Sequence, residues 1–300
     1  MYNIIQKRKI WISISSAMMI ASIIAIAIFG LKLGIDFTGG SLLEVEFSQN
    51  RPTPGDATSA LSGLNLGSLV VQPIGEKGMI LRFQDVTEEK HQEILKKLQE
   101  MSAQGEEAVI KELRFDSVGP TIGKELKSKS FSAMVVILLV IVSFIAYAFR
   151  HVSRPVESWK YGLAAIIALF HDVLITIGVF AFLGEYYNVE INTPFVAAIL
   201  TVLGYSVNDT IVVFDRIREN LPKSNHDFEG TVNVAINQTM VRSINTSLAT
   251  LMTLIAIIFW GGETIKYFAL ALTIGIFVGT YSSIFLASPI LVIWEKMRSK

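Results

Sequence analysis

The chain has 300 residues, of which 51% are hydrophobic and 17% are charged, and its mean hydropathy is +0.50. Soluble globular domains carry about 25% charged residues, so this composition indicates an integral membrane protein. Lys and Arg together number 26, as do Asp and Glu, which leaves no net charge to attract nucleic acid or another polyanion. The absence of cysteine excludes a disulfide framework and a thiolate metal site.

Six apolar runs are each long enough, at about 20 residues, to cross a bilayer. They cover residues 10–31, 131–149, 161–183, 193–214, 244–260 and 268–294. The first run is longer than the apolar part of a signal peptide and no small-residue cleavage site follows it, so it is predicted to be a retained span. The last run contains Pro289, which predicts a tilt or kink near its end.

Basic residues recur on one side of these runs. Lys7, Arg8 and Lys9 precede the first run, and Arg216, Arg218 and Lys223 follow the fourth. The positive-inside rule therefore places both termini in the cytoplasm and the long polar insert outside. The predicted domains are residues 1–31, the cytoplasmic N-terminus and first span, residues 32–128, the extracytoplasmic insert, and residues 129–300, a five-span bundle with a cytoplasmic C-terminus.

The insert has a periodicity of its own. Strands are predicted over 41–47, 69–74, 79–83 and 109–115, and helices over 54–61 and 87–101. The order βαββαβ is that of a ferredoxin-like α+β domain. The predicted fold is thus an α-helical membrane protein with six transmembrane helices and one extracytoplasmic ferredoxin-like domain between spans one and two.

Asp209 is the most informative single residue, because it lies well inside the fourth apolar run, ~23 Å along a helix that rises 1.5 Å per residue. A carboxylate in hydrocarbon is costly, faces a protein interior or a watery path, and by default marks a proton or ion route. A purely structural hydrogen bond or ion pair is the alternative. Tyr205 shares its helical face, and Gly204 and Ser206 are small enough for a neighbouring helix to approach closely.

Four charged residues, Asp215, Arg216, Arg218 and Glu219, follow in the same segment. They lie at the cytoplasmic edge of the fourth span, where long side chains reach water. We interpret them as a helix anchor and not as part of a chemical site.

Arg242 precedes the fifth apolar run, and a polar stripe continues from it along one helical face. The polar residues of this segment are Asn245, Thr246, Ser247, Thr250 and Thr253. Such a stripe should face other helices and not lipid. Arg242 is the natural cationic partner of Asp209, but it fits equally well as a positive-inside anchor, and the spacing leaves both interpretations open.

His171 and Asp172 lie near the middle of the third apolar run. Neighbouring residues of a helix point about 100° apart, so the two side chains need not interact. The pair fits a transmembrane proton relay. It fits equally well a structural tie between the third and fourth spans. No second His or acidic ligand lies three or four residues further on, so no metal site is predicted.

Glycine-rich segments flank the insert. The exit from the first run contains Gly34, Asp36, Gly39 and Gly40, and residues 119–123 form the matching re-entry before the second run. Adjacent glycines permit positive φ and close backbone packing. No Lys-Ser/Thr pair and no helix follow residues 34–40, so we predict a rigid turn and not a phosphate-binding loop.

Together these motifs resemble the SecF family, the smaller half of the SecD–SecF accessory factor of bacterial protein secretion. Segments 34–40 (GIDFTGG), 118–126 (VGPTIGKEL), 171–172 (HD), 204–220 (GYSVNDTIVVFDRIREN) and 242–247 (RSINTS) carry the likeness, which covers essentially the whole chain. The family-motif residues are Gly34, Asp36, Gly39, Gly40, Gly204, Tyr205, Asn208 and Thr246.

The resemblance implies half of a transporter of the resistance-nodulation-division type, whose two six-span halves pack with pseudo-twofold symmetry around a proton path. SecD would supply the other half. The family's fourth-span Asp and fifth-span Arg correspond to Asp209 and Arg242, and the predicted proton pathway comprises Asp209, Arg242, Asp172 and His171.

The resemblance also implies a function. The chain would not be an enzyme and would hold no cofactor, being coupled to protons. It would use the proton-motive force in the bacterial inner membrane to assist late translocation of SecA-dependent preproteins through SecYEG. The implied partners are SecD, SecYEG and YajC.

Two other functions remain open from the residues alone. A proton-coupled small-molecule exporter of the same superfamily would need a substrate cavity in the outside domain, and an insert of roughly 100 residues is small for one. A passive scaffold would tolerate charge-neutral substitutions at Asp209 and Arg242.

Overall fold

The computed structural model describes residues 1–48, 51–102, 110–148 and 156–298. The chain divides into two compact units, one formed by Met1–Lys32 with Ser132–Lys300 and the other by Leu33–Phe131. Within the described ranges, six helices are long and apolar enough to cross a membrane. The protein is therefore a multi-pass membrane protein with a small antiparallel sheet.

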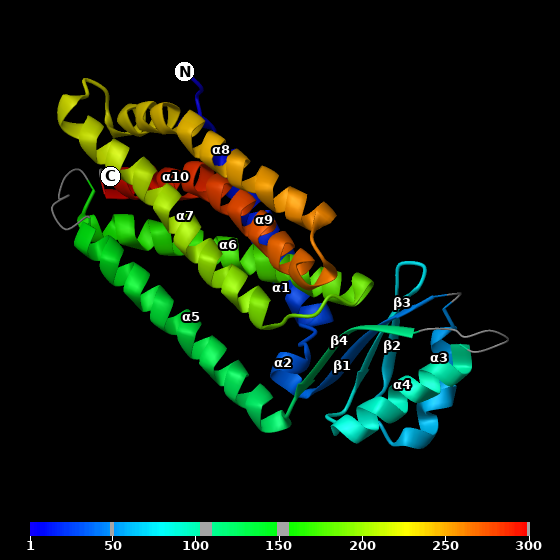
Figure 1. The fold of residues 1–300 in the computed structure, drawn as a ribbon. Helices are drawn as coiled ribbons and strands as arrows, with labels where there is room; N and C mark the ends of the chain where they lie inside the picture. The colour runs from blue at the N-terminus through cyan, green and yellow to red at the C-terminus, as the bar shows by residue number, and fades with distance from the viewer. Residues whose placement is uncertain (49–50, 103–109, 149–155, 299–300) are drawn as a thin grey trace. The chain divides into compact units, whose positions relative to one another are not determined.

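The first unit is a helical bundle (Figure 1). Its elements, in chain order, are η1 (Ile5–Lys7), α1 (Arg8–Phe29), most of α5 (Pro120–Ala148), α6 (Ser158–Tyr187), α7 (Thr193–Asn220), η3 (Leu221–Lys223), α8 (Phe228–Trp260), α9 (Glu263–Ser282), η4 (Ser283–Ala287) and α10 (Ser288–Arg298). Polar caps set two of the helix starts. Asn192 Oδ1 accepts from the Phe195 amide at 3.1 Å, and Asp227 Oδ1 accepts from the Gly230 amide at 2.9 Å.

The core of the bundle lies between α6, α7 and α9, whereas α1, α5 and α8 expose most of their surface. Small residues allow close approach of the central helices. A Cβ atom added to Gly279 would lie 2.9 Å from Cβ of Ser206, so α9 passes α7 with no room for a side chain there. The small residue Ser206, expected to admit a neighbouring helix, does so.

The last predicted span, 268–294, is not one regular helix. A π-helical turn, η4, separates α9 from α10, and Pro289 follows immediately in the first turn of α10. Proline has no N–H to donate and so cannot complete the hydrogen-bond ladder of the preceding turn. Residues of such turns are frequent at functional sites.

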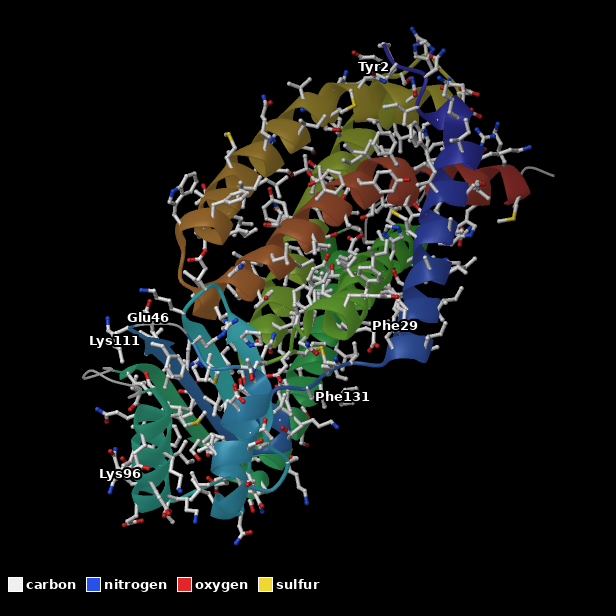
Figure 2. The ribbon with its side chains drawn as sticks, turned by 90° about the vertical axis from the view of Figure 1, so that its right-hand side faces the viewer. Tyr2, Phe29, Glu46, Lys96, Lys111 and Phe131 are labelled. Carbon is white, nitrogen blue, oxygen red and sulfur yellow. The ribbon has the colours of Figure 1, made fainter. Side chains whose placement is uncertain are left out.

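The second unit contains α2 (Ile35–Thr38), β1 (Gly40–Phe47), α3 (Pro54–Leu61), η2 (Ser62–Leu64), β2 (Val70–Ile74), β3 (Gly78–Phe83), α4 (Glu88–Ser102) and β4 (Ile110–Val118). The strands form one antiparallel sheet in the order β2-β3-β1-β4. The helices α3 and α4 cover one face of it (Figure 1). Leu43, Leu81 and Ile94 lie in the core between these layers. Lys96 projects from α4 away from this core (Figure 2).

The alternating pattern of the insert predicted these elements closely, and the helix over 54–61 is confirmed. The final strand was predicted too short, because it continues beyond residue 115 to Val118 (its predicted first residue, 109, is outside the described ranges). Residues 120–123 of the predicted re-entry form the first turn of α5. Pro120 suits that position because the first turn of a helix needs no N–H donor.

The double glycine after α2 makes the turn into β1. Gly39 and Gly40 have φ of +76° and +123°, which L side chains rarely adopt. A Cβ on Gly39 would lie 2.8 Å from Cα of Pro120, and one on Gly40 would lie 2.7 Å from the Phe83 carbonyl oxygen. The two glycine-rich segments predicted to flank the insert therefore pack against each other within the second unit.

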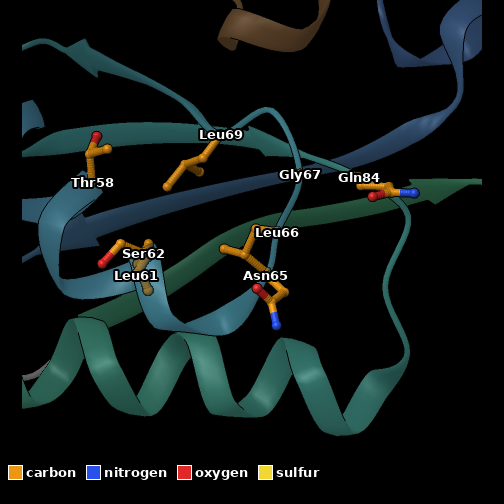
Figure 3. A pocket seen from close by; sticks show the side chains of 8 residues that line it. All are labelled: Thr58, Leu61, Ser62, Asn65, Leu66, Gly67, Leu69 and Gln84. Carbon is orange, nitrogen blue, oxygen red and sulfur yellow. The ribbon is translucent and has the colours of Figure 1, made fainter.

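A hollow of about 560 Å³ lies on the second unit between α3 with η2 and the start of β2 (Figure 3). Its walls combine the buried side chains of Leu61 and Leu66 with the exposed polar side chains of Thr58, Ser62 and Gln84. It is therefore a shallow surface feature with a half-polar lining.

Candidate functional site: two buried carboxylates in the helical bundle

Asp172 is fully buried in α6 and joins three helices. Its Oδ2 accepts hydrogen bonds from Ser206 Oγ on α7 at 2.5 Å and from Ser282 Oγ at the end of α9 at 2.9 Å. Its Oδ1 lies 2.9 Å from Nδ1 of His171. The two neighbouring side chains, which helical geometry left free to diverge, thus interact directly. Among the described residues, Nε2 of His171 is buried without a hydrogen-bond partner.

Asp209 is buried at the seam between α7 and α8, with a residue exposure of 9%. Its Oδ1 accepts a hydrogen bond of 2.5 Å from Ser243 Oγ on α8. Its Oδ2 is buried and has no hydrogen-bond partner in the part of the chain that the structure describes. A carboxylate oxygen left in this state is stable only if the group carries a proton or gains a donor.

The π-helical turn brings a second serine toward Asp209. Ser283 Oγ shares a hydrogen bond of 2.8 Å with Thr210 Oγ1, next to Asp209 in sequence, and lies in the immediate surroundings of the Asp209 carboxylate. Ser282, the preceding residue, contacts Asp172. One short segment of the last span therefore reaches both acidic residues.

Arg242, which the sequence left open as a cationic partner of Asp209 or as a membrane anchor, lies on α8 near the acid. Its side chain is exposed on α8, and no hydrogen bond or ion pair joins the two within the described residues, although its charge is close enough to act on the carboxylate. The next residue, Ser243, turns inward and takes the predicted place of Arg242 beside Asp209. The sequence offered no signal for this, because one position along a helix separates the inward from the outward face.

The polar stripe of α8 divides in the same way. Arg242, Asn245, Thr246 and Thr253 are exposed, whereas Ser247 is buried and bonds to Thr280 on α9 at 2.5 Å. The Tyr205 hydroxyl on α7 donates to Ser247 at 3.3 Å. On α7 itself, Gly204 and Asn208 are exposed, and nothing lies within 4 Å of a Cβ placed on Gly204. Polar and small residues thus line an open surface of α7 and α8.

The remaining predicted residues fall outside this cluster. Asp215 pairs with Arg218 at 2.6 Å and Arg216 with Glu219 at 2.9 Å, all on the exposed end of α7, in agreement with an anchor. The motif residues Gly34, Asp36, Gly39 and Gly40 belong to the second unit and shape its entry turn. No group of three or more His, Cys, Asp or Glu side chains suited to a metal ion occurs among the described residues.

Comparison with known proteins assigns the family. The family model for "Protein export membrane protein SecD/SecF, C-terminal" matches residues 97–297, and the "SecD/SecF GG Motif" matches residues 24–50. The chain belongs to the SecD/SecF family. The second match contains Gly39 and Gly40, the glycines that turn the chain into β1.

Relatives extend the match to nearly the whole chain. Protein translocase subunit SecF of Thermobaculum terrenum is 43% identical over 98% of this chain and 94% of that protein. SecF of Synechocystis is 38% identical over the same shares of the two chains. The crystal structure of SecDF from Thermus thermophilus, a translocon-associated membrane protein, matches with a TM-score of 0.83 and 32% identity over 98% of this chain. The chain spans 39% of the length of that SecDF chain.

Proposed function

We propose that the chain is the SecF-type half of a SecD–SecF complex that uses the proton-motive force to assist late translocation of preproteins. The names of its relatives are those of protein translocase subunits, a role in transport. The proposal depends most on the Asp209 carboxylate, which is buried at the α7–α8 seam with one short hydrogen bond and, among the described residues, one oxygen without a donor. Such a group can take up and release a proton with a local change in packing.

A second six-helix half, of the SecD type, is the proposed partner. Asn208 and Gly204 on α7 and the stripe that begins at Arg242 on α8 are open in this chain alone. Polar side chains at membrane depth are not left facing lipid. A partner bundle over this surface would enclose Arg242 near Asp209 and complete a proton path between the halves, to which Asp172 and His171 contribute.

The sheet-containing unit is proposed to be a ferredoxin-like domain on the extracytoplasmic side, between spans one and two, with both termini in the cytoplasm of a bacterium and the chain in its inner membrane. The element order β1-α3-β2-β3-α4-β4 and the strand order β2-β3-β1-β4 support the fold. The distribution of basic residues supports the orientation. SecYEG, SecA-dependent preproteins and YajC are proposed partners, and protons are proposed to take the place of any cofactor.

The exporter alternative depends on the hollow beside α3 and β2. Its volume of about 560 Å³ lies within the range of small-molecule sites, but such sites are mostly apolar and enclosed. Exposed side chains such as Thr58, Ser62 and Gln84 make half of this wall polar. The geometry therefore favours protein translocation over export of a small molecule.

The proposal is tested by Asp209→Asn in a preprotein translocation assay with inner-membrane vesicles. The completion of translocation after SecA has acted should lose its dependence on the proton-motive force, while the variant still co-purifies with SecD. Asp215→Asn is the matched control, because Asp215 lies six residues further along α7 in the exposed anchor. Full proton-dependent completion in Asp209→Asn would refute the proposal.

A further inference from the structure

One carbonyl oxygen is shared by the two serines that reach the buried acids. The Gly279 carbonyl accepts from Ser282 Oγ at 3.1 Å and from Ser283 Oγ at 2.9 Å. Ser282 also contacts Asp172 Oδ2, and Ser283 lies beside Asp209. Asp172, Ser282 and Ser283 each have 0% exposure, so water does not replace a hydrogen bond that is lost among them.

A serine hydroxyl has one proton and therefore donates to one acceptor at a time. In this structure Ser283 is within bonding distance of the Gly279 carbonyl, and Asp209 Oδ2 has no donor among the described residues. A charged carboxylate is a stronger acceptor than a peptide carbonyl. Ionisation of Asp209 should therefore draw the Ser283 proton away from Gly279.

Movement of the Ser283 proton from Gly279 to Asp209 would also change the hydrogen bonding of Asp172. With Ser283 turned to Asp209, the Gly279 carbonyl loses one of its two donors and becomes a better acceptor for Ser282, which weakens the Ser282 hydrogen bond to Asp172. The π-helical turn that starts at Ser283 makes the exchange local, because its backbone is already irregular and Pro289 follows. The two carboxylates compete for hydroxyl protons held on one segment.

We propose that Ser282 and Ser283 are positioning residues that couple the protonation of Asp172 and Asp209, so that a charge on one acid weakens the hydrogen bonding that stabilises a charge on the other. This inference rests on the proposed role of Asp209 as a proton carrier. The other titratable or charged groups near the two acids, among the described residues, are His171 on α6, Arg242 and Tyr205 on α8 and α7, and Tyr281 on α9. None of them bonds to both carboxylates.

The test is an infrared titration of protonated carboxyl groups in the purified complex, with the Asp209 band identified by its loss in Asp209→Asn. Replacing Asp172 by Asn should move the pH midpoint of the Asp209 band by about one unit in the otherwise wild-type chain. In a chain carrying Ser282→Ala and Ser283→Ala, the same replacement should move that midpoint by less than half as much. Thr273→Val is the control, because Thr273 bonds within α9 to the Ala269 carbonyl at 2.8 Å and should leave the coupling unchanged.

An equal shift in the double serine variant would overturn the inference, as would an Asp209 midpoint that does not respond to Asp172→Asn at all. Neither result would refute the proposed function, which is refuted only if Asp209→Asn retains proton-dependent translocation. If the double variant does not fold, Ser282→Ala alone tests the coupling between Asp172 and Asp209. It removes only the hydroxyl shared between Asp172 and Gly279 and should still abolish most of the shift.

Discussion

Ser243 donates a hydrogen bond of 2.5 Å to Oδ1 of Asp209 and thereby joins α8 to α7 at a buried carboxylate. The residue before it, Arg242, is exposed on the open surface of α8. Helix α8 thus supplies the Ser243 hydroxyl to Asp209 inside the bundle, and presents the Arg242 cation on its outer surface. This arrangement separates the residue that holds Asp209 in place from the residue that can control its charge.

Ser243→Ala should lower the free energy of unfolding of the purified protein in detergent micelles by ~2 kcal/mol. It removes the donor to Asp209 Oδ1, while Asp209 Oδ2 already has no donor among the described residues. Ser143→Ala is the control. Ser143 is exposed on α5 and donates to the Leu139 carbonyl of its own helix at 2.8 Å, so the loss of its hydroxyl should cost less than ~0.5 kcal/mol. Equal stability of the two variants in a denaturant titration would contradict the role given to Ser243.

Arg242→Gln should abolish proton-dependent translocation, because it removes the cation that acts on the Asp209 carboxylate. It should not destabilise the isolated chain, because the Arg242 side chain is exposed there and makes no ion pair among the described residues. Arg216→Gln, which breaks only the exposed pair with Glu219, should leave translocation unchanged. The assay is translocation into vesicles with and without an imposed proton-motive force. A wild-type response of Arg242→Gln would return this residue to the role of a membrane anchor.

Gly40→Ala should destabilise the sheet-containing unit by ~2 kcal/mol or more, since φ is +123° and the new Cβ would lie 2.7 Å from the Phe83 carbonyl oxygen. Gly63→Ala is matched to it in the same unit, with nothing within 4 Å of its Cβ. Limited proteolysis of the full chain should cut within residues 33–131 faster in the first variant only. Comparable resistance of both variants would show that the turn tolerates a side chain.

Glu88 links the stability of the second unit to pH. Hydrogen bonds from Gln92 and then from His91 lower the pKa of Glu88 below its ordinary value of 4.5. Because the folded pKa lies below the unfolded one, the stabilising contribution is complete above pH 4.5 and is lost as the pH falls through the lowered value. Glu88→Gln should remove this part of the acid sensitivity, whereas Glu76→Gln, at the exposed hairpin turn, should retain it. Acid unfolding followed by circular dichroism is the measurement.

Helices and strands of this protein were predictable where apolar residues recur at the spacing of a buried helix or strand face. The alternation at Leu43, Val45 and Phe47 predicted the strand β1, and the helix predicted over 54–61 is α3. Bounds failed where apolar content changes inside one helix, as in α5, whose first turns at Pro120 are polar and were not counted as part of the span.

The site was predictable in its acids but not in their partners. Asp209 and Asp172 stand out because lipid penalises a carboxylate wherever it occurs in an apolar run. Ser243 and Ser282 carry no such signal, because a serine in a membrane helix is common and only the packing of α7, α8 and α9 decides which acid it meets. The inward turn of Ser243, and not of Arg242, toward Asp209 could not be predicted for the same reason.

The most direct test is proton flux through the proposed complex of this chain with SecD in sealed vesicles, followed with a pH-sensitive dye after a pH gradient is imposed. We expect Asp209→Asn, which keeps an acceptor for Ser243, to reduce the flux to the level of empty vesicles, while Asp215→Asn should conduct protons like the wild type. Undiminished proton flux through Asp209→Asn would contradict the central claim that this buried carboxylate carries the proton.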